Sequence, residues 1–541
     1  MELNGKGLED KGPWEKAGFR LPQFDREAMI RATEECPQWV HFGAGNIFRA
    51  FPAALQQTLL EQGIEKTGII VAEGYDGEII DRAFLLYDNL SLAVTLKADG
   101  TIEKRVIASI ARALRLDKPG DFEALRGIFR SPSLQMVSFT ITEKGYSLGD
   151  SSGGRSGLFP EVEADFREGP AAPKSYLGRL AALCYERYRA GKFPLALVSM
   201  DNCSHNGDKL FQGVEPFVIQ WVEKRLVEGE FLDYIRNPAQ VSFPWSMIDK
   251  ITPRPDEGVR KMLEALGFTD TAGQVTAKNT YIAPFVNAEE AQYLVIEDAF
   301  PAGRPALERA GVLFTNRDTV NRVEKMKVCT CLNPLHTALA VFGCLLGYTT
   351  ISAEMKDRDL VRLVEQIGYN EGLPVVVDPG ILSPQEFIDQ VLRVRFPNPF
   401  MPDTPQRIAT DTSQKISIRF GETIKAYLAD PKRKVEDLKL IPLVLAAWLR
   451  YLRGVDDQGA AFTVSPDPLY ETLYPAVAGI NLGQKGPFHQ QLEPILANPT
   501  IFGVNLYEAG LGEQVETYFE KLFAGPGAVR NTLAGCVKRA E

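Results

Sequence analysis

The chain has 541 residues, of which 45% are hydrophobic and 24% charged, a composition that excludes a wholly disordered protein. Its net charge of -10 argues against nucleic acid or an anionic membrane surface as the main partner. Seven cysteines are an odd number and do not suggest a disulfide framework, and residues 1–30 lack the apolar segment of a signal peptide. The longest apolar run, residues 338–348, is shorter than the roughly 20 residues that a membrane span needs. We therefore expect a cytoplasmic protein.

The first part of the chain has the pattern of a βαβ unit. Residues 38–42 (QWVHF) predict a strand, the turn Gly43-Ala44-Gly45 follows, residues 50–62 have helical periodicity and residues 68–72 (GIIVA) predict a second strand. Residues 134–142 and 193–200 are further apolar runs typical of buried parallel strands, and they alternate with helices such as residues 177–190. This order predicts an α/β Rossmann-like domain with a doubly wound, mainly parallel sheet. Residues 148–173 are interpreted as an inserted loop.

After Asp318 the sequence changes to long amphipathic segments. They comprise residues 323–346, 357–368, 384–394, 416–428 and 438–452. Because a single core stops growing near roughly 250–300 residues, a chain of this length is expected to have two domains. We predict a dinucleotide-binding domain over residues 1–318, including an N-terminal arm, and a mainly α-helical substrate and catalytic domain over residues 319–541.

The glycine turn is the candidate cofactor site. Gly43 and Gly45 lie between a strand and a helix, where backbone N–H groups can approach a pyrophosphate. The third glycine of the G-x-G-x-x-G motif is replaced by Phe48, so a turn that serves only chain reversal is the alternative. Glu73 or Asp76, near the end of the second strand, could accept hydrogen bonds from an adenosine ribose and disfavour a 2′-phosphate. NAD is therefore expected rather than NADP.

Six blocks together resemble the polyol-specific long-chain dehydrogenases, the family that includes mannitol 2-dehydrogenase, mannonate oxidoreductase and tagaturonate reductase. The similarity covers about residues 38–450, and its blocks are HFGAGNIFRAF at 41–51, VSFTITEKGY at 137–146, SMDNCSHNG at 199–207, FPWSMIDKITP at 243–253, residues 324–347 and RIATDTSQK at 407–415. In this family Phe-His-Arg commonly follows the glycine turn, where this chain has Ile47-Phe48-Arg49 after Asn46. The resemblance implies that these residues bind the cofactor, and that Thr142, Glu143 and Lys144 contribute to the nicotinamide side of its cleft.

The family works without a metal, and the resemblance implies a catalytic set of Lys327, Asn333, His336 and Asn202. Lys327 is followed by the apolar run VCTCL at 328–332, which would bury the amine and keep it uncharged so that it can take a proton from a carbinol. Asn333 and Asn202 would donate hydrogen bonds to the reacting oxygen, and His336 would orient the substrate. A lysine in a helix is more often a solvated surface charge, and a lone histidine more often a satisfied core residue.

Glu324 lies one helical turn before Lys327, so it would either relay the proton to solvent or form an ion pair with Lys327.

One departure from the family pattern carries a structural prediction. The family usually places the asparagine five residues after the lysine, whereas Asn333 follows Lys327 by six. An extra residue rotates a regular helix by about 100°, so we predict a π-bulge or irregular turn between residues 328 and 332. A rival interpretation is a metal site formed by Cys329, Cys331 and His336, which lacks a fourth ligand.

Arg407 and Lys415 are the candidate substrate-binding cations. They are eight residues apart and would face one cleft if that segment were helical; otherwise they are surface cations. Arginine can bind a carboxylate through two hydrogen bonds. The motifs resemble those of the hexuronate reductases more than those of the mannitol dehydrogenases. The resemblance implies reduction of D-fructuronate to D-mannonate by NADH, with mannitol 2-dehydrogenase or tagaturonate reductase activity as alternatives.

A hypothesis of another class is an NAD-binding sensor without catalysis, which would have no need of Lys327, Asn202 and His336. The expected partners are a small sugar acid or polyol, and the chain is expected to be a monomer or a homodimer.

Overall fold

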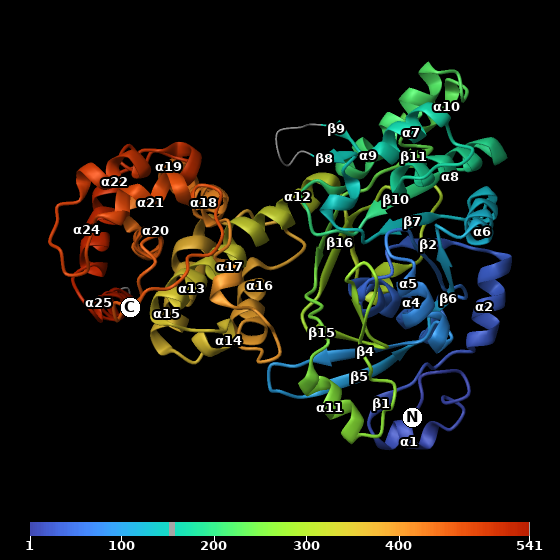
Figure 1. Cartoon of the computed structure of the whole chain (residues 1–541), viewed down its shortest axis with the longest axis horizontal. Coiled ribbons are helices and arrows are strands. Elements are labelled where there is room, and N and C mark those ends of the chain that lie inside the picture. The colour runs from blue at the N-terminus through green and yellow to red at the C-terminus, as the bar shows by residue number, and fades with distance from the viewer. Residues whose placement is uncertain (151–156, 540–541) are drawn as a thin grey trace. The chain divides into compact units, whose positions relative to one another are not determined.

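The computed structural model describes residues 1–150 and 157–539 of the chain. It divides into two units (Figure 1). Unit 1 comprises Met1–Leu96 and Thr101–Asn321, and unit 2 comprises Lys97–Gly100 and Arg322–Glu541. Each unit has its own secondary structure class, so they are described separately.

Unit 1 contains a six-stranded sheet in which every neighbouring pair is parallel. In chain order its strands are β2 (Trp39–Phe42), β3 (Ile69–Glu73), β6 (Ile110–Arg115), β7 (Met136–Phe139), β10 (Leu195–Ser199) and β11 (Val241–Ser242). Their order in space is β11-β10-β7-β2-β3-β6. Numbered one to six along the chain, this is the 3-2-1-4-5-6 order of dinucleotide-binding folds. The predicted doubly wound, parallel sheet is confirmed.

Helices cover both faces of this sheet because alternate residues of a strand point to opposite sides. Val40 and Phe42 pack into one core with the helices α6 (Pro119–Arg130), α8 (Tyr176–Gly191) and α9 (Asn206–Glu223). Trp39 packs into the other core with α3 (Asn46–Ala50), α4 (Pro52–Glu61) and α5 (Glu78–Ala83). Burial on both faces explains why the strands are nearly continuous apolar runs in the sequence.

Two further sheets of unit 1 were not predicted. One has the order β1-β5-β4-β15, formed by β1 (Phe19–Arg20), β4 (Ser91–Leu96), β5 (Ile102–Ile107) and β15 (Phe285–Glu289). The other has the order β12-β16-β17, formed by β12 (Ser246–Asp249), β16 (Tyr293–Glu297) and β17 (Leu313–Thr315). A short two-stranded pair is formed by β13 (Gln274–Val275) and β14 (Tyr281–Ile282).

The prediction of a loop over residues 148–173 is wrong in part. The segment contains the helix α7 (Pro160–Glu168), which buries Val162 against the sheet core, and the two-stranded pair β8 (Gly149–Asp150) and β9 (Gly157–Leu158). Residues 151–156 lie outside the described residues. The remaining helices of unit 1 are α1 (Lys11–Lys16), α2 (Arg26–Glu35), α10 (Glu230–Arg236) and α11 (Glu257–Ala265).

Unit 2 is helical, as predicted. Its central helices are α13 (Asn333–Leu346), α20 (Leu440–Tyr451) and α24 (Gly512–Leu522), where α20 packs on both of the others. The stretch Arg317–Leu346 is long and apolar enough to cross a membrane, but 83% of its most apolar window is buried in the protein, as in a core helix. The other helices are α12 (Arg317–Met326), α14 (Ile351–Glu354), α15 (Arg358–Gln366), α16 (Pro384–Gln390), α17 (Pro405–Ile408), α18 (Thr412–Ile416), α19 (Glu422–Ala429), α21 (Tyr470–Ala478), α22 (His489–Leu496), α23 (Pro499–Phe502) and α25 (Ala528–Arg539).

Unit 2 also contains π-helical turns, and one of them absorbs the extra residue noted in the sequence. The π-helix η4 (Lys327–Cys331) lies between α12 and α13, and the N–H of Leu332 donates to the carbonyl oxygen of Lys327 over 3.1 Å, five residues earlier. The predicted π-bulge is confirmed. Similar turns are η5 (Ile367–Gly372), η7 (Val391–Arg395) and η8 (Ser417–Gly421), and both η5 and η8 pack against η4. Such turns often occur at functional sites.

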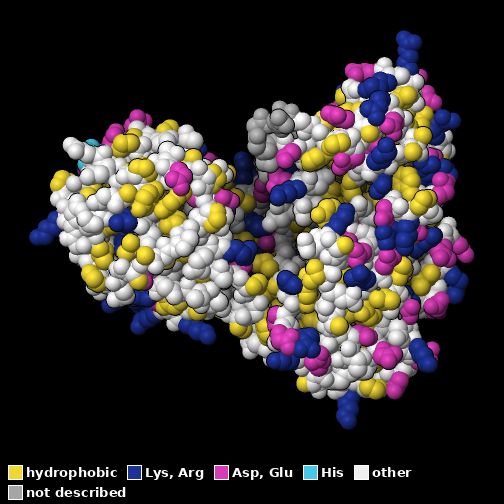
Figure 2. All heavy atoms as spheres, viewed as in Figure 1, with side chains coloured by type: hydrophobic (Ala, Val, Ile, Leu, Met, Phe, Trp, Pro, Cys, Tyr) yellow, Lys and Arg dark blue, Asp and Glu magenta, His cyan; other side chains and the backbone are white. Residues whose placement is uncertain are grey.

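The visible surface of unit 1 carries both signs of charge. On the face drawn in Figure 2, Lys and Arg side chains are interspersed with Asp and Glu over the larger body.

Candidate cofactor and catalytic sites

The glycine turn lies where the strand order of the sheet reverses, between β2 and β7. Gly43 has a φ of +104°, and a Cβ there would lie 2.3 Å from the carbonyl oxygen of Thr140, so only glycine fits. Gly45 precedes α3 without a side-chain cap, and nothing lies within 4 Å of where its Cβ would be. In open α/β sheets this position binds nucleotides. The bare helix start and the open space beside Gly45 therefore fit the pyrophosphate of a dinucleotide.

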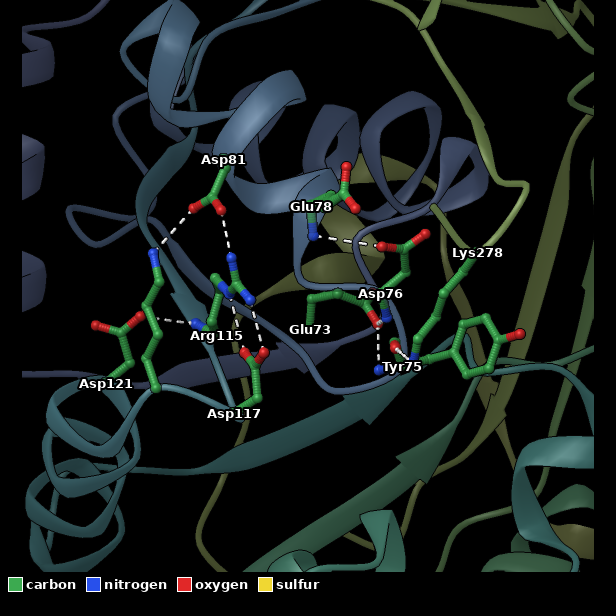
Figure 3. Close-up of polar contacts among 10 residues, drawn as sticks. Glu73, Tyr75, Asp76, Glu78, Asp81, Arg115, Asp117, Asp121 and Lys278 are labelled. Atoms are coloured by element: carbon green, nitrogen blue, oxygen red, sulfur yellow. Dashed lines mark hydrogen bonds and ion pairs between the residues drawn. The ribbon is translucent and has the colours of Figure 1, made fainter. Parts of the chain in front are cut away.

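Glu73 holds the glycine turn in place. Its carboxylate accepts hydrogen bonds from the backbone N–H groups of Ala44 (2.9 Å), Tyr75 (2.7 Å) and Asp76 (3.1 Å), and the residue is 5% exposed. The buried Asp76 accepts from the hydroxyl of Thr276 over 2.6 Å (Figure 3 shows the loop). The carboxylates of both acids that were predicted to bind the ribose thus accept hydrogen bonds from groups of the protein.

An arginine stands beside this loop, at the end of β6. The guanidinium of Arg115 forms ion pairs with Asp81 and Asp117 (Figure 3). A Cβ on Gly77 would lie 2.4 Å from Arg115 Nε, so the guanidinium packs directly against the loop that follows Asp76. The hydrogen bond with Asp117 raises the pKa of Arg115. Its charge is therefore already compensated by two carboxylates.

The residues after the glycine turn belong mainly to the core. Phe48 is fully buried and stacks on His41 with ring centroids 4.3 Å apart. Arg49 is 1% exposed and donates to the carbonyl oxygen of Ala283 (2.8 Å) and to Asn46 Oδ1 (3.0 Å). Ile47 is half-buried. Residues 46–49 can contact a cofactor through their backbone, while the buried side chains of Phe48 and Arg49 pack in the core beneath the turn.

The loops after β7 and β10 are joined by a carboxylate that the sequence analysis did not single out. Asp201 accepts from the backbone N–H groups of Ile141 (3.0 Å) and Thr142 (2.8 Å) and from the hydroxyl of Tyr146. Thr142 has a φ of +65°, a conformation that non-glycine residues rarely adopt. Asp201 therefore fixes a strained backbone next to the predicted Asn202.

The other predicted residues of these loops are exposed. Asn202 directly follows Asp201 beyond the end of β10, and its side chain is exposed. Glu143 and Lys144 are exposed on the 3-10 turn η2 (Glu143–Tyr146), where Glu143 pairs with Lys209.

Lys327 is buried in unit 2, with 4% of its surface exposed, at the first position of η4. Asn333 begins α13, and His336 lies one turn further along that helix. Glu324 is half-buried on α12, one helical turn before Lys327. The π-turn thus places a buried amine immediately before the helix that carries the predicted amide and imidazole.

The imidazole of His336 is affected by the charges of three arginines. Its side chain is 14% exposed, and Nε2 lies 3.6 Å from Asp403 Oδ2. Burial, together with the smaller effect of the guanidinium charges of Arg419, Arg407 and Arg395, lowers the pKa of His336 to about 3. His336 is therefore neutral near pH 7 and can exchange hydrogen bonds without carrying charge.

The two predicted substrate cations do not share one helix. The backbone breaks between α17 and α18 at Asp411, whose φ is +54°. The side chain of Arg407 is 61% exposed and pairs with the buried Asp403. Lys415 is half-buried, and its Nζ donates to the carbonyl oxygen of Thr410 over 2.7 Å. Burial, followed by the charge of Arg419, lowers the pKa of Lys415.

The two cysteines of the rival metal interpretation are thiols near neutral pH. Burial raises the pKa of Cys329 to about 11 and raises that of Cys331 further. Across residues 1–150 and 157–539, no three His, Cys, Asp or Glu side chains are grouped so that they could hold a metal ion.

Together, a parallel sheet of the dinucleotide-binding order and a helical unit with a buried lysine define the architecture of a two-domain dehydrogenase. Residues 37–309 match the mannitol dehydrogenase Rossmann domain, and residues 319–523 match the mannitol dehydrogenase C-terminal domain. The chain belongs to the mannitol dehydrogenase family.

Individual relatives are similar to this chain over nearly its full length. The chain is 54% identical to the D-mannonate oxidoreductase of Thermotoga maritima, over 100% of both chains. Among solved structures, a substrate-free D-sorbitol dehydrogenase has a TM-score of 0.81 at 25% identity, covering 98% of this chain and 100% of that one. The mannitol 2-dehydrogenase of Pseudomonas fluorescens, in a ternary complex with NAD and D-mannitol, has a TM-score of 0.67 at 28% identity, covering 100% of this chain and 99% of that one.

Proposed function

We propose that the chain interconverts D-fructuronate and D-mannonate, with D-fructuronate, NADH and a proton giving D-mannonate and NAD. The observation that carries this proposal is the 54% identity, over the whole of both chains, to a D-mannonate oxidoreductase. In this proposal residues 1–318 bind the dinucleotide, and residues 319–541 hold the sugar acid and the catalytic lysine.

The charges around the loop that follows β3 support NAD rather than NADP as the cofactor. A 2′-phosphate would meet the carboxylates of Glu73 and Asp76, which lie at the end of the second strand of the fold. Figure 3 shows two cations beside that loop: Arg115 is held by Asp81 and Asp117, and Lys278 donates to the carbonyl oxygen of Tyr75.

The proposed chemistry centres on Lys327. NADH, when bound, supplies the hydride; Lys327 Nζ donates a proton to the oxygen that was the carbonyl oxygen of the substrate, and takes it back in the reverse direction. The amides of Asn333 and Asn202 donate hydrogen bonds to the same oxygen while it has alkoxide character. The neutral His336 orients a neighbouring hydroxyl, and Glu324 exchanges the proton between Lys327 and solvent.

The reaction is tested by following NADH absorbance with D-fructuronate, D-tagaturonate and D-fructose in parallel. We expect D-fructuronate to give the highest kcat/KM. A higher value with D-fructose would favour the mannitol 2-dehydrogenase activity that the likeness to the Pseudomonas structure supports. No turnover with any of the three would favour a sensor.

A further inference from the structure

In the part of the chain that the structure describes, Arg419 is an ionised side chain without a compensating carboxylate. It lies in the π-turn η8, is half-buried, and its Nη1 donates to the hydroxyl of Thr337 over 2.5 Å. Within the described residues it forms no ion pair. Burial lowers its pKa to about 10. Removing a guanidinium from water without an anionic partner is costly, so an anionic ligand would stabilise it.

The position of Arg419 connects it to the predicted catalytic residues. Thr337, its partner, is buried next to His336 on α13, and its hydroxyl donates in turn to the carbonyl oxygen of Asn333 over 2.9 Å. The turn η8 packs against η4, which holds Lys327, and against α13. The charge of Arg419 also reaches His336, because it lowers the pKa of that imidazole.

The other cations whose charges reach His336, Arg407 and Arg395, both have interactions within the protein. Arg407 pairs with Asp403, and Lys415 donates to the backbone of its own loop. Arg419 lies four residues after Lys415, and within residues 1–150 and 157–539 its guanidinium donates to one protein group, the hydroxyl of Thr337. A planar guanidinium with free donors matches a carboxylate in charge and shape.

We propose that Arg419 binds the carboxylate of the substrate and thereby selects a sugar acid over a neutral polyol. This inference rests on the proposed function, because D-fructuronate carries its carboxylate at the end of the carbon chain remote from the ketone. The buried Thr337 holds the guanidinium beside His336, which places the anion at a fixed position relative to the reacting end of the sugar.

The test compares Arg419→Gln and Arg419→Lys with the control Arg393→Gln, whose side chain is 76% exposed in the wild type. Binding of D-mannonate and of D-mannitol to the protein with NAD is measured by calorimetry, since these ligands differ only in a carboxylate. We expect Arg419→Gln to weaken D-mannonate binding about 100-fold, the scale for removing one partner of a close charge pair. D-Mannitol binding should change less than about twofold, and Arg419→Lys should lie between.

Kinetics and stability complete the test. With D-fructuronate, the loss in Arg419→Gln should appear mainly in KM, because the contact is made equally in the ground and transition states. The thermal midpoint should equal or exceed that of the wild type, since a poorly compensated charge is removed. Equal losses for D-mannonate and D-mannitol, a lowered thermal midpoint, or unchanged D-mannonate binding would overturn the proposal.

Measurements of D-mannonate binding and of D-fructuronate turnover can distinguish a failure of this inference from a failure of the proposed reaction. A wild type that binds D-mannonate through Arg419 but does not reduce D-fructuronate would contradict the reaction and support the carboxylate site. A wild type that reduces D-fructuronate, with Arg419→Gln equally active, would support the reaction and overturn the carboxylate site.

Discussion

Asp201 Oδ1 accepts a hydrogen bond of 2.8 Å from the backbone N–H of Thr142, and this bond joins the loops that follow β10 and β7. The second oxygen of Asp201 receives the N–H of Ile141 and the hydroxyl of the buried Tyr146. Burial raises the pKa of Asp201, while the hydrogen bonds from Tyr146, Ile141 and Thr142 oppose that shift. The carboxylate is thus a positioning group for the neighbouring Asn202.

Asp201→Ala is therefore expected to damage the site and the fold together. Three donors lose their acceptor, which should lower the free energy of unfolding by about 2–3 kcal/mol. The displaced loops should lower kcat/KM by about 10–100-fold, because small displacements of reacting groups are costly. Steady-state kinetics and urea unfolding measure the two effects, and Asp233→Ala, an exposed position on α10, is the control. Wild-type kinetics in Asp201→Ala would contradict the positioning role.

Lys327→Ala tests the proposed acid and base. Removing a general acid and base typically lowers kcat by about 10²–10⁴-fold, whereas the NADH dissociation constant should stay within about twofold because Lys327 lies outside unit 1. Lys325→Ala, an exposed lysine two residues earlier, is the matched control and should retain full turnover. The assignment fails if Lys327→Ala turns over at the wild-type rate.

The fold could be predicted from the sequence because its signals are local. The strands of the parallel sheet are apolar runs, and the single extra residue between Lys327 and Asn333 indicated the π-turn that the structure contains. The smaller sheets escaped prediction because β1 and β15 are short or only partly apolar and pair with strands far away in the sequence.

The supporting residues of the sites could not be predicted for a related reason. Asp201 acquires its role from Thr142 and Tyr146, which lie 59 and 55 residues away. Arg419 resembles an ordinary helical surface cation until Thr337, 82 residues earlier, is brought beside it. Glu73 or Asp76 was expected to meet a ribose, yet the carboxylate of Glu73 accepts hydrogen bonds from backbone N–H groups, including that of Ala44 29 residues earlier.

Cofactor preference should respond to the two carboxylates that hold Arg115. The double variant Asp81→Asn with Asp117→Asn removes both charges and leaves the guanidinium free for an anion. We expect kcat/KM with NADPH to rise about tenfold, roughly the 1.4 kcal/mol of a modest charged hydrogen bond, while activity with NADH changes little. Glu123→Gln, whose side chain is 59% exposed, is the control. An unchanged ratio of NADPH to NADH activity would show that Arg115 does not reach the ribose.

The burial of Glu354 leads us to predict that the free energy of unfolding of unit 2 depends on pH. This residue is fully buried on α14, and burial raises its pKa from 4.5 to about 9. Among the residues that the structure describes, neither of its carboxyl oxygens has a hydrogen-bond partner. Between these values the folded state binds a proton that the unfolded state has lost, so stability falls as the pH rises. From pH 4.5 to pH 7 the loss from this group alone is about 3 kcal/mol, at 1.36 kcal/mol for each pH unit.

Glu354→Gln should remove this dependence because the amide has the shape of the protonated acid and does not ionise. At pH 5 the variant and the wild type should have similar free energies of unfolding, and at pH 8 the variant should be more stable by a few kcal/mol. Urea unfolding at pH 5, 6, 7 and 8 measures both, and Glu365→Gln, on the exposed face of α15, should follow the wild type throughout. If the wild type and Glu354→Gln lose stability in parallel as the pH rises, the buried carboxyl is not the group that titrates. A glutamine side chain has no proton to lose and cannot make the free energy of unfolding depend on pH.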